Sequence, residues 1–234
     1  MTVLLPEEGK PNPPVLYLLH GMSDDDTSWA RRTSIERYLD GLGLAVVMPQ
    51  VHRSFYVDEA QGLRYWTFLT EELPQLVGRL LRVSERREDT FVAGLSMGGY
   101  GALKWALRHP DRFAAAASLS GALGIAETRG EGRWPEDPAF PERVFGAQSS
   151  TDTDDDLQWL AGRSELSAST CPRLYLCCGT DDELYDDNVR FRDACVARCL
   201  PLTVDFGPGA HNWEYWDTKI QDVLAWLPIL RPAG

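Results

Sequence analysis

The sequence predicts an α/β fold in which a mostly parallel central sheet is covered by helices on both faces. Six short apolar runs have the composition of buried parallel strands, and segments with helical spacing of apolar residues separate them. This alternation of strand and helix is typical of a parallel sheet between two helical layers. The predicted strands are 15–19, 45–48, 90–94, 114–119, 174–178 and 202–206, and the predicted helices are 35–42, 69–83, 98–108, 187–199 and 213–227.

The length and composition indicate one domain. The chain has 234 residues, 44% of them hydrophobic, so we expect a single core and a single domain over 1–234. A cap-like insertion is expected at about 121–166, where Gly, Pro, Trp and an acidic run at 152–156 interrupt the alternation. The acidic run indicates the start of a solvated helix, because Asp is favoured at the positive end of the helix dipole. A calcium loop fits less well, since the EF-hand spacing and its closing Glu are absent.

The charge balance excludes several classes of partner. The formal net charge is −12, with 35 Asp and Glu against 23 Lys and Arg, so the surface should repel nucleic acid and anionic membranes. No apolar run approaches the roughly 20 residues that cross a bilayer, so we expect no membrane insertion. The segment 1–10 lacks the basic stretch and apolar core of a secretory signal, which favours a cytoplasmic location.

The cysteines indicate a reduced interior rather than a metal site. There are five, an odd number, and Cys177 and Cys178 are adjacent within an apolar run, as expected for thiols in the core. Cys195 and Cys199 lie four apart on a predicted helix, but no nearby His or further Cys completes a set of ligands. We therefore expect no metal and no cofactor.

A predicted strand, a tight turn and a predicted helix meet around Ser96. The strand 90–94 runs directly into Gly94-Leu95-Ser96-Met97-Gly98, the pattern Gly-x-Ser-x-Gly, and the helix follows at once. A serine on so sharp a turn has a strained backbone, and small residues at 94 and 98 let the helix and strands pack close to it. A phosphate-binding turn is the alternative, but the Gly-x-Gly-x-x-Gly spacing and a P-loop lysine are absent. This context predicts that Ser96 is the nucleophile of a serine hydrolase.

The strand 15–19 ends where an α/β hydrolase places part of its oxyanion hole. The chain there reads Leu19-His20-Gly21-Met22, and Gly21 allows the backbone to turn outward. We expect the backbone N–H groups of Met22 and Met97 to bind the oxygen of a tetrahedral intermediate. His20 precedes the turn and is expected to brace the loop through hydrogen bonds rather than to act as a base.

The order of the catalytic groups in this fold limits the choice of base. The order is serine, acid, histidine, and only His211, in the loop after the strand 202–206, follows the late strands. His109 lies at a predicted helix end, where we expect a cation that interacts with the helix dipole. The acid should follow the strand 174–178, and the residues alone leave three carboxylates open there. These are Asp181, Asp182 and Glu183.

These motifs and several longer segments resemble the tributyrin esterase and S-formylglutathione hydrolase (esterase D) family of α/β hydrolases. The resemblance covers nearly the whole chain and is closer to the tributyrin-esterase branch, whose members hydrolyse short-chain acyl esters and, in some cases, acetylated or feruloylated sugars. The segments that carry it are Leu-Tyr-Leu-Leu-His-Gly-Met at 16–22, Met-Pro-Gln-Val-His-Arg-Ser-Phe-Tyr at 48–56, Tyr-Trp-Thr-Phe-Leu-Thr-Glu-Glu-Leu-Pro at 65–74, Gly-Leu-Ser-Met-Gly-Gly-Tyr-Gly-Ala at 94–102 and Gly-Ala-His-Asn-Trp at 209–213.

The resemblance implies further site residues. It places the acid at Asp182, the second Asp of a Gly-x-x-Asp-x-hydrophobic turn that ends with Leu184. It also places several side chains in segments that border the acyl and alcohol pockets of the family. The substrate-binding side chains expected on this basis are His52, Tyr56, Trp66 and Trp213, with Phe55 and Tyr65 in the same segments.

The resemblance also bears on the edges of the sheet. Relatives usually have one more strand before the strand expected here at 2–6, so 114–119 corresponds to their sixth strand and the insertion follows that region. The segment 2–6 would then form an edge, and because strand edges can pair with another chain, a homo-oligomer is a possible assembly.

Together these observations predict a serine carboxylesterase that hydrolyses short-chain acyl esters through a Ser-His-Asp triad and an acyl-enzyme intermediate. Its partner would be a small-molecule acyl ester. A thioesterase such as S-formylglutathione hydrolase, acyl transfer to an alcohol, and an acetyl or feruloyl carbohydrate esterase are alternatives that the same triad supports. A non-catalytic binding protein on a hydrolase scaffold is a third hypothesis, which the presence of every expected catalytic position disfavours.

Overall fold

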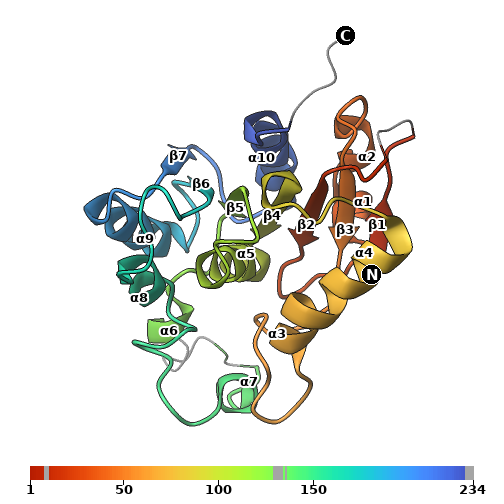
Figure 1. Cartoon of the computed structure of the whole chain (residues 1–234). Helices are drawn as coiled ribbons and strands as arrows, with labels where there is room; N and C mark the ends of the chain where they lie inside the picture. The colour runs from red at the N-terminus through yellow and green to blue at the C-terminus, as the bar shows by residue number, and fades with distance from the viewer. Residues whose placement is uncertain (8–10, 129–133, 135, 230–234) are drawn as a thin grey trace.

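A single seven-stranded sheet organises the chain (Figure 1). The computed structural model describes residues 1–7, 11–128, 134 and 136–229. The strand order is β1-β3-β2-β4-β5-β6-β7, and every neighbouring pair is parallel except β1 and β3. The strands are β1 (Thr2–Leu4), β2 (Val15–Leu19), β3 (Ala45–Met48), β4 (Thr90–Leu95), β5 (Ala115–Leu119), β6 (Arg173–Gly179) and β7 (Leu202–Gly207). The mostly parallel sheet is thereby confirmed, and the six predicted strands are present at the predicted places. Burial of all six is wrong for β7, because it lies at the edge of the sheet and Thr203 and Val204 are exposed.

Both faces of the inner strands β3, β2, β4, β5 and β6 are buried, which explains why these strands are apolar without alternation. In β2, Val15 and Tyr17 contact one hydrophobic cluster, whereas Leu16 and Leu18 contact the other. Successive side chains of a strand point to opposite faces, so each of them enters a core.

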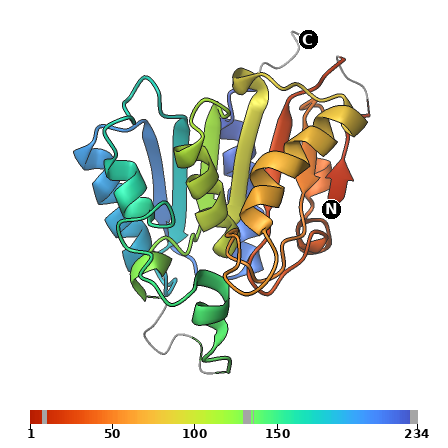
Figure 2. The same ribbon diagram turned by 60° about the horizontal axis from the view of Figure 1, so that its bottom comes forward.

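Helices cover the two faces as the alternating pattern predicts (Figure 2). Residues of α4, α5, α8 and α9 form one cluster with the sheet, and residues of α1, α2 and α10 form the other. The helices are α1 (Ser28–Arg32), α2 (Ile35–Tyr38), α3 (Tyr65–Thr67), α4 (Leu73–Leu81), α5 (Met97–Arg108), α6 (Ile125–Thr128), α7 (Phe140–Phe145), α8 (Leu157–Gly162), α9 (Tyr185–Ala197) and α10 (Trp213–Trp226), with a π-helical turn at Phe68–Glu72 and a 3₁₀ turn at Arg87–Asp89.

Two helices differ from the predicted ranges for local reasons. The helix expected at 35–42 ends at Tyr38, because the chain turns through Gly41 and Gly43, whose φ angles are 71° and 60°. The helix expected at 69–83 is preceded by the π-helical turn and by α3, and α4 ends at the left-handed residue Arg82. The apolar spacing continued past both ends, so spacing alone did not show where the backbone turns.

The insertion lies between β5 and β6, and its described part contains the short helices α6, α7 and α8 but no strand. Its acidic run begins a helix, as predicted: the Asp156 carboxylate accepts hydrogen bonds from the N–H groups of Gln158 and Trp159 at the start of α8. Asp155 also forms an ion pair with the buried Lys104 of α5 at 2.6 Å. The run therefore anchors the insertion to α5.

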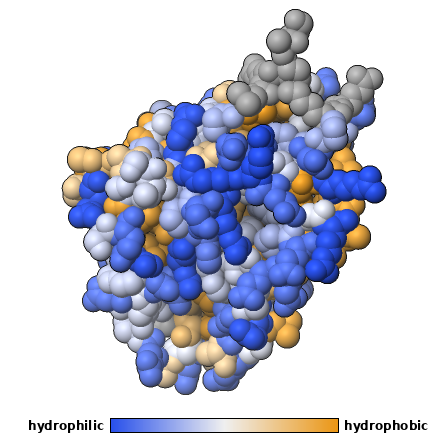
Figure 3. Space-filling view, viewed as in Figure 1, coloured by the Kyte–Doolittle hydropathy of each residue, from blue (hydrophilic) through white to orange (hydrophobic). Residues whose placement is uncertain are grey.

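The thiols and the surface agree with the composition. All five cysteines are free, and Cys177 and Cys178 are buried, which confirms their place in the core. The face in Figure 3 is mostly hydrophilic, and its apolar side chains lie in small separate groups. Within the described ranges, none of the helices has the length and apolar content needed to cross a bilayer.

Candidate active site

Ser96 lies at the sharp turn between β4 and α5 with a strained backbone. Its φ and ψ angles are 53° and −117°, a conformation that residues other than Gly seldom adopt. A Cβ atom at Gly94 would lie 2.4 Å from the Gly98 carbonyl oxygen, and one at Gly98 would lie 2.5 Å from the Leu19 carbonyl oxygen. The strained turn and the close packing predicted from Gly-x-Ser-x-Gly are therefore both present.

The backbone of Ser96 is held on both sides by the segment that follows β5. Its N–H donates to the Leu119 carbonyl at 2.9 Å, and its own carbonyl accepts from the Ala122 N–H at 3.0 Å. These two bonds fix the direction in which the side chain leaves the turn.

Ser96, His211 and Asp182 form one continuous chain of hydrogen bonds. His211 Nε2 lies 3.0 Å from Ser96 Oγ, and His211 Nδ1 lies 3.0 and 2.9 Å from the two carboxylate oxygens of Asp182. A carboxylate can only accept, so Nδ1 carries the proton and Nε2 is free to accept the serine proton. The three residues come from three loops at the carboxyl end of the sheet, after β4, β6 and β7.

The turn after β6 presents only one of its three carboxylates to His211. Asp182 is buried, while Asp181 and Glu183 are exposed. Burial acts to raise the pKa of Asp182, but hydrogen bonds from His211 and from the Leu184 N–H outweigh it, so the pKa is lowered. Asp182 is therefore ionised where the orienting acid of a triad must be.

The loop after β2 lies against Ser96, as the expected oxyanion hole requires. A Cβ atom at Gly21 would lie 3.7 Å from Ser96 Cβ and 2.7 Å from Leu95 Cδ1. The N–H of Met97 is the first of α5 and has no carbonyl within the helix to bind. The N–H of Met22 donates no hydrogen bond to any group in the described part of the chain.

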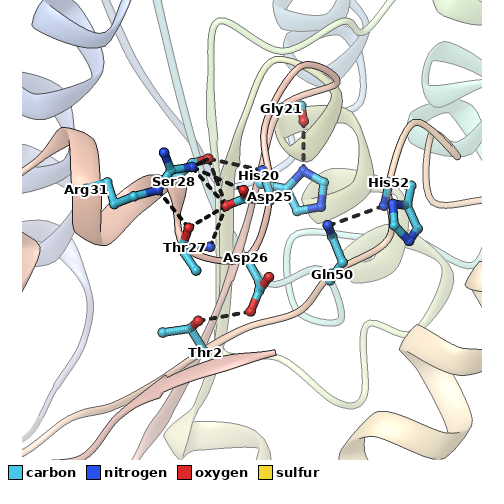
Figure 4. Close-up of polar contacts among 10 residues, drawn as sticks. All are labelled: Thr2, His20, Gly21, Asp25, Asp26, Thr27, Ser28, Arg31, Gln50 and His52. Carbon is cyan, nitrogen blue, oxygen red and sulfur yellow. Dashed lines mark hydrogen bonds and ion pairs between the residues drawn. The ribbon is translucent and has the colours of Figure 1, made fainter.

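His20 braces this loop, as predicted (Figure 4). Its Nε2 accepts from the Val51 N–H at 3.2 Å, so its Nδ1 carries the proton and donates to the Gly21 carbonyl at 2.7 Å. The acidic residues that follow support the same loop. Asp25 accepts from the N–H and hydroxyl of Thr27 at 2.8 and 2.6 Å and pairs with Arg31 at 3.1 Å, just before α1 (Figure 4).

The pKa of His20 predicts a loss of stability in acid. Burial lowers this pKa, and the bond to Gly21 and the acidic residues 24–26 only partly offset it. The unfolded chain takes up the proton near pH 6.5, so below that pH it binds more protons than the folded state and stability falls as pH falls. We expect urea titrations from about pH 8 to about pH 5 to show this loss, about 1.4 kcal/mol for each unit by which the pKa is lowered.

The variant His20→Phe isolates this contribution from those of other groups. The variant should be less stable than the wild type at high pH, because two hydrogen bonds are lost, and the difference should shrink in acid. A difference between wild type and variant that stays constant across the pH range would contradict this role.

A hollow of about 410 Å³ lies beside the expected oxyanion loop. It is the candidate substrate site because Met22 lines it, although Ser96 and His211 do not. Its residues come from the loop after β2, from the segment 52–59 and from α7 of the insertion. They are Met22, Ser23, Asp24, His52, Arg53, Glu59, Phe140, Arg143 and Val144. His52 thus lies at the hollow, where its N–H donates to Gln50 at 3.4 Å (Figure 4). The contribution of α7 was not anticipated, although the apolar pair Phe140 and Val144, spaced one helical turn apart, is a signal for it.

Tyr56 and Trp66 do not line this hollow, so the pocket roles implied for them are wrong. Tyr56 is fully buried, and its hydroxyl donates to the His20 carbonyl at 2.9 Å, so it supports the oxyanion loop from the core. Trp66 packs along the second half of α5, with the Lys104 ammonium 4.3 Å from its ring centre. Both aromatic side chains fill space against α5 instead of facing substrate.

Trp213 also has a supporting role. It is half-buried at the start of α10 and packs edge to face against Trp29 at 5.3 Å and Trp216 at 5.4 Å. Trp216 in turn packs against the His211 ring at 4.9 Å. These indoles hold the loop of His211 from behind, and Trp213 is absent from the lining of the described hollow.

His109 is at the end of α5 but is not the cation predicted there. Burial and the nearby Arg112 and Arg108 lower its pKa, and its ring stacks on Trp66 with 5.9 Å between centres and 25° between planes. The neutral ring is favoured first because the side chain is partly buried, and further because two arginines already carry positive charge at this helix end. Within the described residues, no group of three or more His, Cys, Asp or Glu side chains is arranged to hold a metal ion.

Comparison with known proteins shows which family the sequence and fold of this chain match. The family described as "Putative esterase" matches residues 1–227. An acetyl esterase of Caldicellulosiruptor saccharolyticus is 29% identical over 221 residues, which cover 91% of this chain and 82% of that protein.

Two solved structures from Staphylococcus aureus are similar over 96% of this chain at 35% identity. One is the fluorophosphonate-binding serine hydrolase FphF with bound substrate, at a TM-score of 0.88 and 90% coverage of that chain. The other is the S-formylglutathione hydrolase FrmB, at a TM-score of 0.84 and 91% coverage. With the family match over nearly the whole length, this chain belongs to the esterase family of α/β hydrolases and is a carboxylic ester hydrolase.

Proposed function

We propose that this chain is a serine carboxylesterase that hydrolyses short-chain acyl esters through an acyl-enzyme intermediate. The observation that carries the proposal is the unbroken hydrogen-bond chain from Ser96 Oγ through His211 to Asp182. Such a chain lets a neutral imidazole take the serine proton while the buried carboxylate stabilises the imidazolium that forms.

The reaction then has two halves. His211 Nε2 takes the proton of Ser96 as Oγ attacks the ester carbonyl, and the N–H groups of Met22 and Met97 bind the oxyanion. The tetrahedral intermediate collapses, the C–O bond to the alcohol breaks, and His211 returns the proton to the departing alcohol oxygen. A water molecule, deprotonated by His211, next attacks the acyl-Ser96 ester. Collapse of the second intermediate releases the carboxylic acid and restores the serine.

The hollow beside Met22 supports a small substrate. Its volume is about 410 Å³, and Phe140 and Val144 of α7 are apolar residues of its lining. The insertion at 121–166 is in this proposal a cap over the substrate. The name of the acetyl esterase relative and the resemblance to tributyrin esterases agree with a short acyl group.

The length of the acyl chain tests this proposal. We expect kcat/KM for p-nitrophenyl esters to decline from butyrate to octanoate, by about tenfold, because a hollow of about 410 Å³ suits a small ester better than a long acyl chain. Specificity is measured as initial rates over a series from acetate to octanoate. A higher kcat/KM for octanoate than for butyrate would refute the short-chain assignment while leaving the triad untouched.

A thioesterase is the second candidate, favoured by the 35% identity to an S-formylglutathione hydrolase. An acetyl or feruloyl carbohydrate esterase is also compatible with the same triad. Assays of S-formylglutathione, acetylated sugars and methyl ferulate beside p-nitrophenyl acetate distinguish them, since the preferred leaving group should have the highest kcat/KM. We keep the cytoplasm as the proposed location, which the free thiols support.

A further inference from the structure

The side-chain amide of Asn188 in α9 joins two parts of the site that are distant in sequence. Its Nδ2 donates to the Gly121 carbonyl at 2.9 Å and to the Leu184 carbonyl at 2.8 Å. The residue is 0% exposed, and its Oδ1 has no partner among the described residues. A buried polar oxygen without a partner is unfavourable. The two N–H bonds are thus what the amide contributes at this position.

Gly121 belongs to the segment that holds the nucleophile. Leu119 and Ala122, on either side of it, bind the N–H and the carbonyl of Ser96. Between them Ser120 has a left-handed φ of 48°, and its N–H donates to the Cys177 carbonyl at 2.8 Å. The Gly121 carbonyl accepts the Leu123 N–H at 2.9 Å within this segment, and the Asn188 amide adds a donor from α9, outside the segment.

Leu184 belongs to the turn that carries the acid. Its N–H donates to Asp182 Oδ1 at 2.9 Å, and the N–H of Tyr185 donates to the Asp182 carbonyl at 3.0 Å. The Leu184 carbonyl also accepts the backbone N–H of Asn188 at 3.1 Å. The acid turn is therefore bound to α9 with or without the side-chain amide, whereas the hydrogen bond to Gly121 depends on it.

We propose that Asn188 is a positioning residue that sets the distance between Ser96 and Asp182. It thereby sets the orientation of the His211 ring, which hydrogen-bonds to both. This inference rests on the proposed roles of the triad. Removing the amide leaves the Gly121 carbonyl with the local Leu123 N–H as its donor and breaks the hydrogen bond that joins the Ser96 segment to α9. A shift of about 1 Å between reacting groups costs about 10²-fold in rate.

The test uses Asn188→Leu in the full chain, because leucine keeps the volume and removes the donors. We expect kcat on p-nitrophenyl acetate to fall by about 10- to 100-fold, with KM within about threefold of the wild type. Thr70→Val is the matched control, since the buried Thr70 hydroxyl also donates to a backbone carbonyl, that of Trp66, but away from the site. It should keep kcat within about threefold.

A double-mutant cycle separates positioning from general destabilisation. In an Asp182→Asn background, Asn188→Leu should lower kcat by less than about threefold, because the Asp182 carboxylate that Asn188 positions is already absent. Three outcomes would each overturn the proposal. They are fold-losses in kcat of the two single variants that multiply in the double variant, an unchanged kcat for Asn188→Leu, and an equal loss of kcat in Thr70→Val. If Asn188→Leu does not fold, Asn188→Ser replaces it, because a serine at 188 can bond back to Leu184 but is too short to reach Gly121.

The outcome can be told apart from a failure of the proposed function. If the wild type lacks ester turnover, or if Ser96→Ala keeps it, the triad assignment fails. If both behave as expected and Asn188→Leu is fully active, only the positioning role is wrong.

Discussion

Ser96→Ala is expected to fold normally and to lose ester turnover by a factor on the order of 10⁶. The Ser96 hydroxyl has one hydrogen bond, to His211 Nε2, whereas the turn itself is held by backbone bonds to Leu119 and Ala122. The substitution therefore removes the nucleophile without touching the packing of β4 and α5. Turnover of p-nitrophenyl acetate and circular dichroism measure the two effects separately.

A covalent probe adds an independent measurement of the same residue. An organophosphonate should label the native chain once, on Ser96, and should not label Ser96→Ala. Ser84→Ala is a suitable control. Ser84 is buried, it lies between α4 and the turn that precedes β4, and its hydroxyl donates to Asp89. Labelling at another residue, or more than a few per cent of activity left in Ser96→Ala, would remove Ser96 from the proposed role.

Asp182→Asn should be far more damaging than Asp181→Asn. The Asp182 carboxylate accepts the Nδ1 proton of His211 at 2.9 Å and is buried, whereas the side chain of Asp181 is exposed. An amide at 182 can present its N–H₂ to Nδ1 and favour the wrong tautomer, in which Nε2 cannot accept the serine proton. In a serine triad this costs about 10⁴-fold in turnover, or about 5 kcal/mol of barrier.

Asp181→Asn is the matched control for this substitution. It changes the same chemical group one position away and should leave kcat within about threefold, because only an exposed carboxylate is lost. Both variants are checked for folding by circular dichroism and assayed for kcat on p-nitrophenyl acetate. If Asp181→Asn proved to be the inactive variant, the acid would be misplaced by one residue.

Local patterns were sufficient for the parts of the fold and site that depend on nearby residues. The five inner strands could be predicted from the sequence because a strand buried on both faces must be apolar along its whole length. The Gly-x-Ser-x-Gly turn could be read because its strain and its close packing are requirements of a few adjacent residues. The role of His20 as a brace followed from its place just before the turn at Gly21.

The roles of side chains that depend on contacts with residues distant in sequence could not be predicted from local patterns. Residues alone left Asp181, Asp182 and Glu183 equivalent, and resemblance to a family selected Asp182. Tyr56 and Trp66 were expected at the pocket because their segments border it in relatives, but aromatic side chains suit a core as well as a pocket. Which of the two they enter depends on α5, which lies 30 residues or more further along the chain.

The sequence by itself therefore determined the parallel sheet, the turn at Ser96 and the choice of His211, because each follows from periodicity, local strain or chain order. Only the tertiary structure decided which carboxylate meets His211 and that α7 forms one wall of the hollow. It also decided that the His109 ring stacks on Trp66 with a lowered pKa, and that Asn188 joins the Ser96 segment to the acid turn. Each of these depends on which groups share a small volume after folding. Burial, and the charges and hydrogen-bond partners nearby, then set the pKa and the role of each group.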